Sequence, residues 1–323
     1  MYGFLLFGAW WWMLWTPGRA SVGPLQPLNA TELELEGQLR RDVEFLAGDI
    51  GERNIPGKSK QLEAAAAFID RSLQAVGYQP RSQVYNLGGT ACRNIEAEIR
   101  GVERPGEVVI VGAHYDSVTD SPGADDNASG VATMLALARS FAGRRLARTV
   151  RFVGFANEEP PYFGHAEMGS LVYAKRCQQA GDRVVAMLSI ESVGFYSNSP
   201  LSQHYPAGLG FFYPSTGNFV AFVGNIRSRP LLHKTLMAFR NAGSLPSLGA
   251  ALPNAVPGVG WSDHWSFWQQ GFPGLEITDT ALYRNPYYHT PEDTPDRLDY
   301  RRMARFAWAM QAVLEQLAGL GSS

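Results

Sequence analysis

Residues 108–117 have the sequence VVIVGAHYDS, an apolar run that ends in a histidine, a tyrosine, an aspartate and a serine. Four β-branched residues in a row predict a buried strand. An imidazole at the end of such a strand can bind a metal ion. An aspartate two residues further on can accept its other N–H group and fix its tautomer. His114 and Asp116 are therefore the first candidate site residues, although such a pair also occurs without a metal.

Similar apolar runs recur along the chain and alternate with helical patterns. Strands are predicted at 95–99, 108–112, 150–155, 184–190 and 274–277, and helices at 130–141, 169–180, 230–241 and 301–317. This alternation predicts an α/β fold of three layers, in which a mostly parallel central sheet carries helices on both faces. Ligands of such sheets bind beyond the carboxyl ends of the strands, which is where His114 is expected.

Two more helices are predicted before the first strand. One begins at a capping box formed by Thr31 and Glu34, and the other spans 59–76 and stops at Gly77. The stretch 192–260 is rich in glycine, proline and aromatic residues and is predicted to form loops, with one strand near 219–223 and one helix. Loops of this length often cover a functional site. That they are ordinary surface loops without a function is an alternative of equal weight.

Composition limits the classes of protein to which the chain can belong. Its 323 residues are 45% hydrophobic and 18% charged, which is typical of a folded globular protein. We expect a single catalytic domain over residues 30–320. The net charge of −2 is spread along the chain without a basic stripe, so nucleic acid is not an expected partner.

The chain has two cysteines, Cys92 and Cys177. This number excludes a disulfide framework and a zinc cluster built on paired thiolates. Any metal must therefore be held by histidines and carboxylates. Spacing does not decide whether the two thiols form a single disulfide, because they lie far apart in the sequence.

The N-terminus begins with a continuous apolar, Trp-rich run from Met1 to Trp15, which Pro17, Gly18 and Arg19 interrupt. The run is shorter than the ~20 residues of a typical membrane span, and no lysine or arginine precedes it. Residues 1–20 are predicted to be a secretory signal peptide, with an uncleaved membrane anchor as the second interpretation and a buried core segment as the third. Either of the first two implies an exported protein, periplasmic or extracellular, that contacts a membrane only through this anchor.

Acidic residues follow the other predicted strands. Residues 123–130 (GADDNASG) lead into an apolar helix, 157–161 (NEEPP) follow the strand at 150–155, and Glu191 ends the strand at 184–190. The segment 261–265 (WSDHW) precedes the last predicted strand, and 288–294 (YHTPEDT) follows it. For Asp125 and Asp126 alone, helix capping would be a sufficient explanation.

These acids and histidines together are harder to explain without a metal. Carboxylates that converge at one edge of a sheet repel one another and raise each other's pKa values, a cost that divalent cations remove. Two histidines and three carboxylates without a thiolate suit a pair of zinc ions bridged by one carboxylate.

The ordered motifs HYDS, GADDNASG, NEE, IES, SDHWSFW and YHTPEDT resemble family twenty-eight of the zinc metallopeptidases. This family includes bacterial leucyl aminopeptidases and glutamate carboxypeptidase. The resemblance covers roughly residues 33–317. It implies two zinc ions, with ligands shared among five residues: His114 and Glu191 on one ion, Glu159 and His289 on the other, and Asp126 bridging both.

The resemblance also implies roles for neighbouring residues. Glu158 corresponds to the general base, Asp116 to the partner of His114, and the peptide bond after Asp126 is expected to be cis. Glu191 departs from the pattern, because many relatives have an aspartate there. The substrate is then a peptide with a free N-terminus, from which the enzyme removes the first residue. Other divalent metals also fit such ligands.

Residues that flank the predicted ligands are expected to support or line the site. Asp293 could orient His289, and Asp263 and His264 could line the cleft behind the ligands. A side-chain pocket could be built from aromatic residues, although these are more often core: Phe211, Phe212, Trp261 and Trp265.

Three other functions remain open at this stage. A glutaminyl cyclase would share the scaffold but bind one zinc ion, and the pair Asp125 and Asp126 favours the two-zinc peptidase. A carboxypeptidase needs a basic cluster, for which Arg284 is the lone candidate. A binding ectodomain that has lost catalysis usually lacks a ligand, whereas here every expected position is filled.

Overall fold

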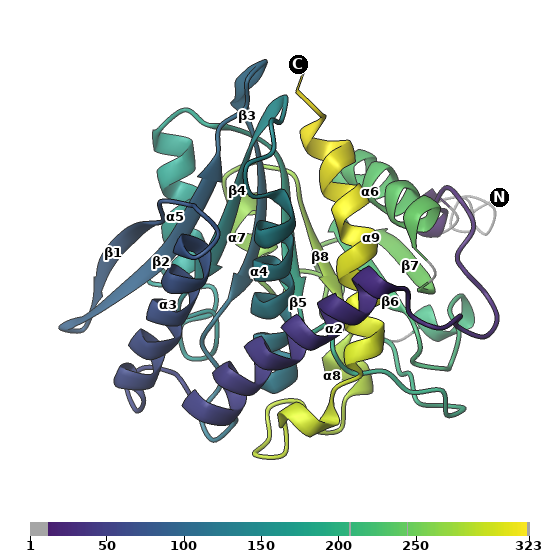
Figure 1. Ribbon diagram of the computed structural model, residues 1–323. Coiled ribbons are helices and arrows are strands. Elements are labelled where there is room, and N and C mark those ends of the chain that lie inside the picture. The colour runs from purple at the N-terminus through teal and green to yellow at the C-terminus, as the bar shows by residue number, and fades with distance from the viewer. Residues whose placement is uncertain (1–11, 207, 244, 322–323) are drawn as a thin grey trace.

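Eight strands form one mixed sheet, and helices cover both of its faces (Figure 1). The structure is a computed structural model that describes residues 12–206, 208–243 and 245–321. The predicted α/β class with three layers is confirmed. The strands are β1 (Arg81–Leu87), β2 (Thr90–Ile99), β3 (Arg104–His114), β4 (Arg148–Phe155), β5 (Arg183–Glu191), β6 (Val220–Asn225), β7 (Ser247–Leu252) and β8 (Gly274–Thr278).

The strand order is β1-β2-β4-β3-β5-β8-β6-β7. The four central strands, β4, β3, β5 and β8, run parallel to one another. On either side the direction reverses, since β2 is antiparallel to β4 and β6 is antiparallel to β8. The carboxyl ends of the four central strands therefore open on the same edge of the sheet.

Two apolar cores lie on opposite faces of the sheet, and a separate apolar cluster forms around β7. The α-helices with bounds in the described part of the chain are α2 (Ala30–Val43), α3 (Ser59–Gln74), α4 (Gly130–Phe141), α5 (Gly169–Gln179), α6 (Arg229–Ala242), α7 (His264–Gln269), α8 (Ala281–Arg284) and α9 (Tyr300–Ala318). Figure 1 shows α4, α9 and α2 in front of the sheet and α5 and α7 behind it. α3 and α6 contribute to the larger core on the front side.

Alternation along β3 explains this division. Val109 and Val111 belong to the larger core, whereas Val108 and Ile110 pack in the smaller core with residues of α5 and α7. Successive side chains of a strand point to opposite faces, so an uninterrupted apolar run is what a strand buried on both faces requires. α4 is buried along most of its length, which explains why its sequence is apolar all round.

The predicted local structure needs correction in several places. Helix α2 begins at Ala30, because Asn29 and Glu32 form the capping box in place of Thr31 and Glu34. β1 was missed because it is an edge strand with mostly polar residues, and β7 because it is built largely from serine, glycine and alanine. The short helix α7 was missed as well.

The N-terminal segment that the structure describes packs against α6. Arg229 Nε donates to the Trp12 carbonyl at 3.0 Å, and its guanidinium lies 4.2 Å from the centre of the Trp12 ring. Arg240 Nη1 donates to the Pro17 carbonyl at 2.6 Å. Within the described residues, no helix combines the length and apolarity that a membrane crossing needs. Residues 1–11 lie outside the described part, so the signal peptide or anchor stays a prediction.

The two cysteines are buried and free, which answers the question left open by their spacing. Cys92 belongs to the larger core and Cys177 to the smaller one, so the sheet separates them.

We predict that thiol titration in denaturant yields two reactive thiols per chain and that a reductant leaves the urea midpoint unchanged. A single disulfide would instead give no free thiol and a midpoint that falls on reduction.

Candidate metal centre

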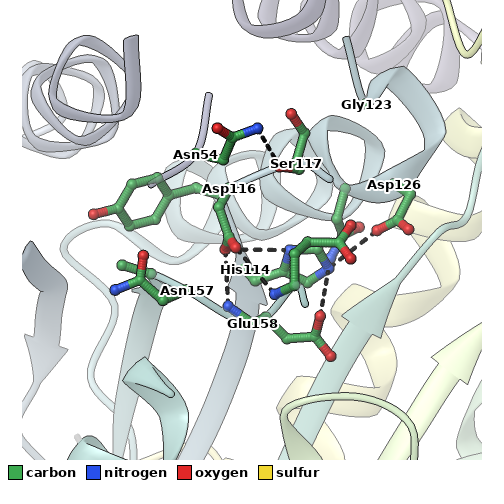
Figure 2. A network of polar contacts seen from close by, with 12 residues as sticks. Asn54, His114, Asp116, Ser117, Gly123, Asp126, Asn157 and Glu158 are labelled. Atoms are coloured by element: carbon green, nitrogen blue, oxygen red, sulfur yellow. Dashed lines mark hydrogen bonds and ion pairs between the residues drawn. The ribbon is translucent and has the colours of Figure 1, made fainter. Parts of the chain in front are cut away.

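The strand ends bring the predicted ligands together. His114 ends β3, Glu159 follows β4, and Glu191 ends β5. Asp126 lies in the turn before α4, and His289 lies in the loop after α8. Figure 2 shows His114 at the centre of the network, with dashed lines to Asp126, Asp116 and Glu158. All five expected ligands thus meet at the carboxyl edge of the parallel strands.

The five residues divide into two groups that share Asp126. In the first group, His114 Nε2 lies 3.1 Å from Asp126 Oδ1 and 3.1 Å from Glu191 Oε2. In the second, His289 Nε2 lies 3.0 Å from Asp126 Oδ2 and 3.4 Å from Glu159 Oε2. Within each group, the atoms that could ligate a metal lie within 4.8 Å of one another. Asp126 offers one carboxylate oxygen to each group, as a bridging ligand would.

The donor set fits divalent cations on chemical grounds. Imidazole and carboxylate donors without a thiolate suit zinc and similar metals. Asp126 Oδ1 and Glu159 Oε1 are buried and have no hydrogen-bond partner among the described residues. Burial raises the pKa of Glu159 to about 7 and raises the pKa of Glu191. These carboxyl groups resist ionisation in this enclosed site, and a bound cation would reverse that resistance.

Asp116 positions the loop after β4. Its two carboxylate oxygens accept the backbone N–H groups of Glu158 and Glu159, each at 3.1 Å. Asp116 Oδ1 also lies 3.6 Å from His114 Nδ1, which is longer than a hydrogen bond. Asp116 is therefore beside His114, as predicted, and it additionally anchors the two glutamates.

Asp125 and Asp293 fix the turn that carries Asp126. The Asp293 oxygens accept the backbone N–H groups of Asp125 and Asp126 at 2.9 and 3.2 Å. This corrects the expectation that Asp293 orients His289. Asp125 accepts from the Gly194 N–H and the Asn285 amide, both at 2.8 Å, so it is turned away from the two ligand groups. The peptide bond after Asp126 is cis, as the resemblance implied.

Asn127 connects this turn to the end of β5. Its side-chain amide donates to the Ile190 carbonyl at 2.8 Å, and its oxygen accepts the Ser192 N–H at 3.0 Å. The residue between these two contacts is Glu191, which also accepts the Ser262 hydroxyl at 2.8 Å. The sequence motif singled out the neighbouring acids, but nothing in it indicated this role for the asparagine.

Arg53 is the main site residue that sequence reasoning missed. It is fully buried and donates to three carbonyls near the site, those of Tyr115 (2.7 Å), Pro122 (2.5 Å) and Gly123 (2.8 Å). Burial lowers its pKa to about 10, which the acids around it oppose, so it stays charged at neutral pH. A single arginine in a loop has no sequence pattern that separates it from a surface residue.

A cavity opens beside the two ligand groups. Asp126, Glu158 and Glu191 line one part of it, and most of its other lining residues are apolar. Trp261 lines this cavity as predicted. Phe211 and Phe212 are exposed to solvent, and Trp265 packs beside Phe163 with the ring centres 6.0 Å apart, which corrects three of the four pocket predictions.

Asp263 and His264 lie behind the cleft. Both are fully buried. Desolvation raises the pKa of Asp263 to about 7. The His264 Nε2 atom lies 2.9 Å from the Val259 carbonyl, and burial lowers the pKa of its imidazole to about 4, so this histidine is neutral.

Two histidine–carboxylate groups that share one aspartate, next to a free glutamate and a cavity, define a metal-dependent hydrolase. Residues 94–314 match peptidase family M28. The chain therefore belongs to this family and is an enzyme, a peptidase that hydrolyses peptide bonds. The resemblance drawn from the ordered motifs is confirmed.

Individual relatives agree with this assignment. The chain is 36% identical over 277 residues to the uncharacterised protein YfbL of Escherichia coli K12, which covers 83% of this chain and 84% of that protein. It is 28% identical over 289 residues to a probable leucine aminopeptidase 1 of Trichophyton verrucosum. This match covers 85% of this chain and 69% of that protein.

Solved structures show the same fold. The zinc aminopeptidase BSAP from Bacillus subtilis superposes with a TM-score of 0.70 at 15% identity, covering 89% of this chain and 95% of BSAP. A glutaminyl cyclase from Fimbriiglobus ruber superposes with a TM-score of 0.63 at 18% identity, covering 93% of this chain and 99% of the cyclase. At these identities the similarity establishes the fold and does not choose between the two activities.

We predict that Arg53→Met lowers the free energy of unfolding by at least ~3 kcal/mol, because it leaves several buried carbonyls without a donor. Urea unfolding measures this, and Arg183→Met is the control because that arginine is largely exposed. The control should stay within about 0.5 kcal/mol of the wild type. An Arg53→Met protein as stable as the control would show that the guanidinium does not hold these loops.

Proposed function

We propose that this enzyme is a zinc-dependent aminopeptidase with two zinc ions. The observation that carries the proposal is the sharing of Asp126 between two ligand groups, each with one histidine and one further carboxylate. In this proposal, His114 and Glu191 would hold one ion, Glu159 and His289 would hold the other, and Asp126 would contribute to both. When bound, the ions supply electrophilic activation of the scissile carbonyl and of the attacking water.

Glu158 is proposed as the general base. Its carboxylate lines the cavity, and its Oε2 atom lies 3.9 Å from His114 Nε2, next to the first ligand group. Burial raises its pKa well above the usual value, as does the negative charge of Glu191, although the charge of His114 opposes this. A carboxylate with a raised pKa can take a proton from the attacking water and pass it to the leaving amine.

Asp116 is proposed as a positioning residue. It accepts the backbone N–H groups of the base and of the ligand that follows it, so it fixes how the Glu158 and Glu159 side chains leave the main chain. One side chain can then face the attacking water while its neighbour holds an ion.

The surroundings of the site favour a free N-terminus over a free C-terminus. A substrate α-amine would meet the acids at the cavity mouth, Asp126, Glu158 and Glu191. A carboxypeptidase would need cations there, and the earlier candidate Arg284 has other partners. It donates to Gln203 at 2.8 Å and to the Phe219 carbonyl at 2.8 Å. The leucine aminopeptidase relatives support the same choice.

Glutaminyl cyclase is the second candidate, because solved cyclases share the fold. The second ligand group argues against it. A one-zinc enzyme needs only one ligand group, whereas here a histidine and a glutamate accompany Asp126 in each of two groups.

We predict that the metal-free protein takes up two zinc ions per chain. Asp126→Ala should lose both ions, because it removes a ligand from each group, whereas Glu159→Ala should lose one. Glu158→Gln serves as the control and should keep both. Elemental analysis after dialysis gives the stoichiometry. One ion per wild-type chain at saturation would favour the cyclase and end the two-zinc proposal.

We further predict that aminoacyl anilides with a free amine are hydrolysed and that the same compounds with an acetylated amine are not. Glu158→Gln should lower kcat by about 10²- to 10⁴-fold, which is the range for removing a general base. A chelator should abolish the activity, and added zinc should restore it. Equal rates on free and acetylated compounds would rule out an aminopeptidase.

A further inference from the structure

Glu276 is a buried acid that the proposed chemistry does not use. It lies in the middle of β8, within the apolar sequence GLEIT. In the pairing of β5 with β8, Glu276 is opposite Ser189 and Thr278 is opposite Glu191. Glu276 is therefore on the same face of the sheet as Glu191, two residues, or about 6.6 Å, further from the strand ends.

The cavity beside the metal centre connects these two depths. Glu276 lines it together with Asp126, Glu158 and Glu191. The cavity thus has the proposed reaction centre at one level and a single carboxylate at a deeper level. A substrate whose amine and scissile carbonyl sit at the metal centre would direct its first side chain along this path.

The walls between the two levels are largely apolar. They come from β6 and β7 and from the loops that cover them, and they include Ala221, Val223, Ala250, Leu252 and Val259. Such walls suit an unbranched aliphatic stem.

Among the described residues, no arginine or lysine lines the cavity, and no hydrogen bond reaches the Glu276 carboxylate. The nearest basic group is His264, whose Nε2 atom lies 4.0 Å from Glu276 Oε2. That imidazole is buried and neutral, as described above. The carboxylate therefore lacks a partner that the protein itself could supply, and a charge in such surroundings is costly unless it is paired.

We propose that Glu276 makes this cavity selective for a basic N-terminal residue, lysine or arginine, whose cationic head pairs with it while the stem lies along the apolar walls. This rests on the proposed aminopeptidase function and specifies its substrate class. It differs from the preference for leucine that the names of the relatives suggest for those proteins.

The size of the effect follows from the burial of the Glu276 carboxyl group. A cavity built to pair with a polar group discriminates strongly against a substrate that lacks it, because the buried partner is then left alone. Norleucine is the matched comparison, since it is lysine without the terminal ammonium group.

The test compares the anilides of lysine, arginine, norleucine and leucine with the zinc-loaded full chain. We expect kcat/KM for the lysine substrate to exceed that for norleucine by roughly 10-fold or more. Glu276→Gln should lower kcat/KM for lysine by a similar factor and change norleucine by less than about 3-fold. Glu276→Leu should make norleucine the better substrate. Glu107→Gln, which removes a carboxylate at the opposite end of β3, should keep the wild-type ratio.

The outcomes separate the two proposals. If no free-amine anilide is hydrolysed, the aminopeptidase function fails. If norleucine is hydrolysed at least as well as lysine and Glu276→Gln leaves their ratio unchanged, only the basic selectivity is overturned. If the Glu276 variants do not fold, inhibition of the wild type by free lysine and free norleucine decides: stronger inhibition by lysine supports the proposal, and equal or weaker inhibition refutes it.

Discussion

The crowding of buried acids at one edge of the sheet is the constraint on which the rest of the structure depends. Carboxylates this close repel one another, and burial adds to the cost of ionising them. The residues concerned are Asp116, Asp125, Asp126, Glu158, Glu159, Glu191, Asp263 and Asp293, all of which are buried. Two imidazoles and the guanidinium of Arg53 offset part of this charge. A pair of divalent cations would offset most of the remainder, which is why the sharing of Asp126 between two groups is the central feature of the site.

Only some of these acids face the place where cations would bind. Asp116 and Asp293 each use both oxygens on two successive backbone N–H groups, and Asp125 accepts from Gly194 and Asn285. These three carboxylates therefore stabilise the loops by accepting hydrogen bonds, and the loops position the ligands. Arg53 stabilises the loop after β3 by donating to the Tyr115 carbonyl near its beginning and to the Pro122 carbonyl near its end. A site built in this way is fixed before any metal or substrate arrives, which is the condition for electrostatic catalysis.

The sequence predicted the chemical groups of the site well and their supports poorly. The ligands could be found because the ordered motifs that carry them resemble those of a known family. The strands could be found because a strand segment buried on both faces is apolar without interruption, as residues 108–113 of β3 are. Arg53, Asn127 and the true role of Asp293 could not be found in this way. Each acts through hydrogen bonds to backbone more than 60 residues away, and no local pattern encodes such a partner. The same reason explains the missed strand β7, whose small residues become a cavity wall only after β6 and β8 are in place.

The change of strand direction between β8 and β6 separates the proposed metal centre from the part of the cavity that we propose binds the first side chain of the substrate. The parallel strands β3, β4 and β5 end in or just before residues of the proposed metal centre, whereas β6 runs antiparallel to β8 and pairs with it along its edge. In the sequence GLEIT, apolar and polar residues alternate as in a strand with one solvent-exposed face. This pattern gives no reason to place Glu276 in a binding site. The sheet order changes that interpretation, because the face that carries Glu276 is covered by the loops between 192 and 260 and is continuous with the cavity at Glu191. A change of one side chain at this depth can alter which first residue is accepted while the ligands, which hang from the strand ends, keep their places.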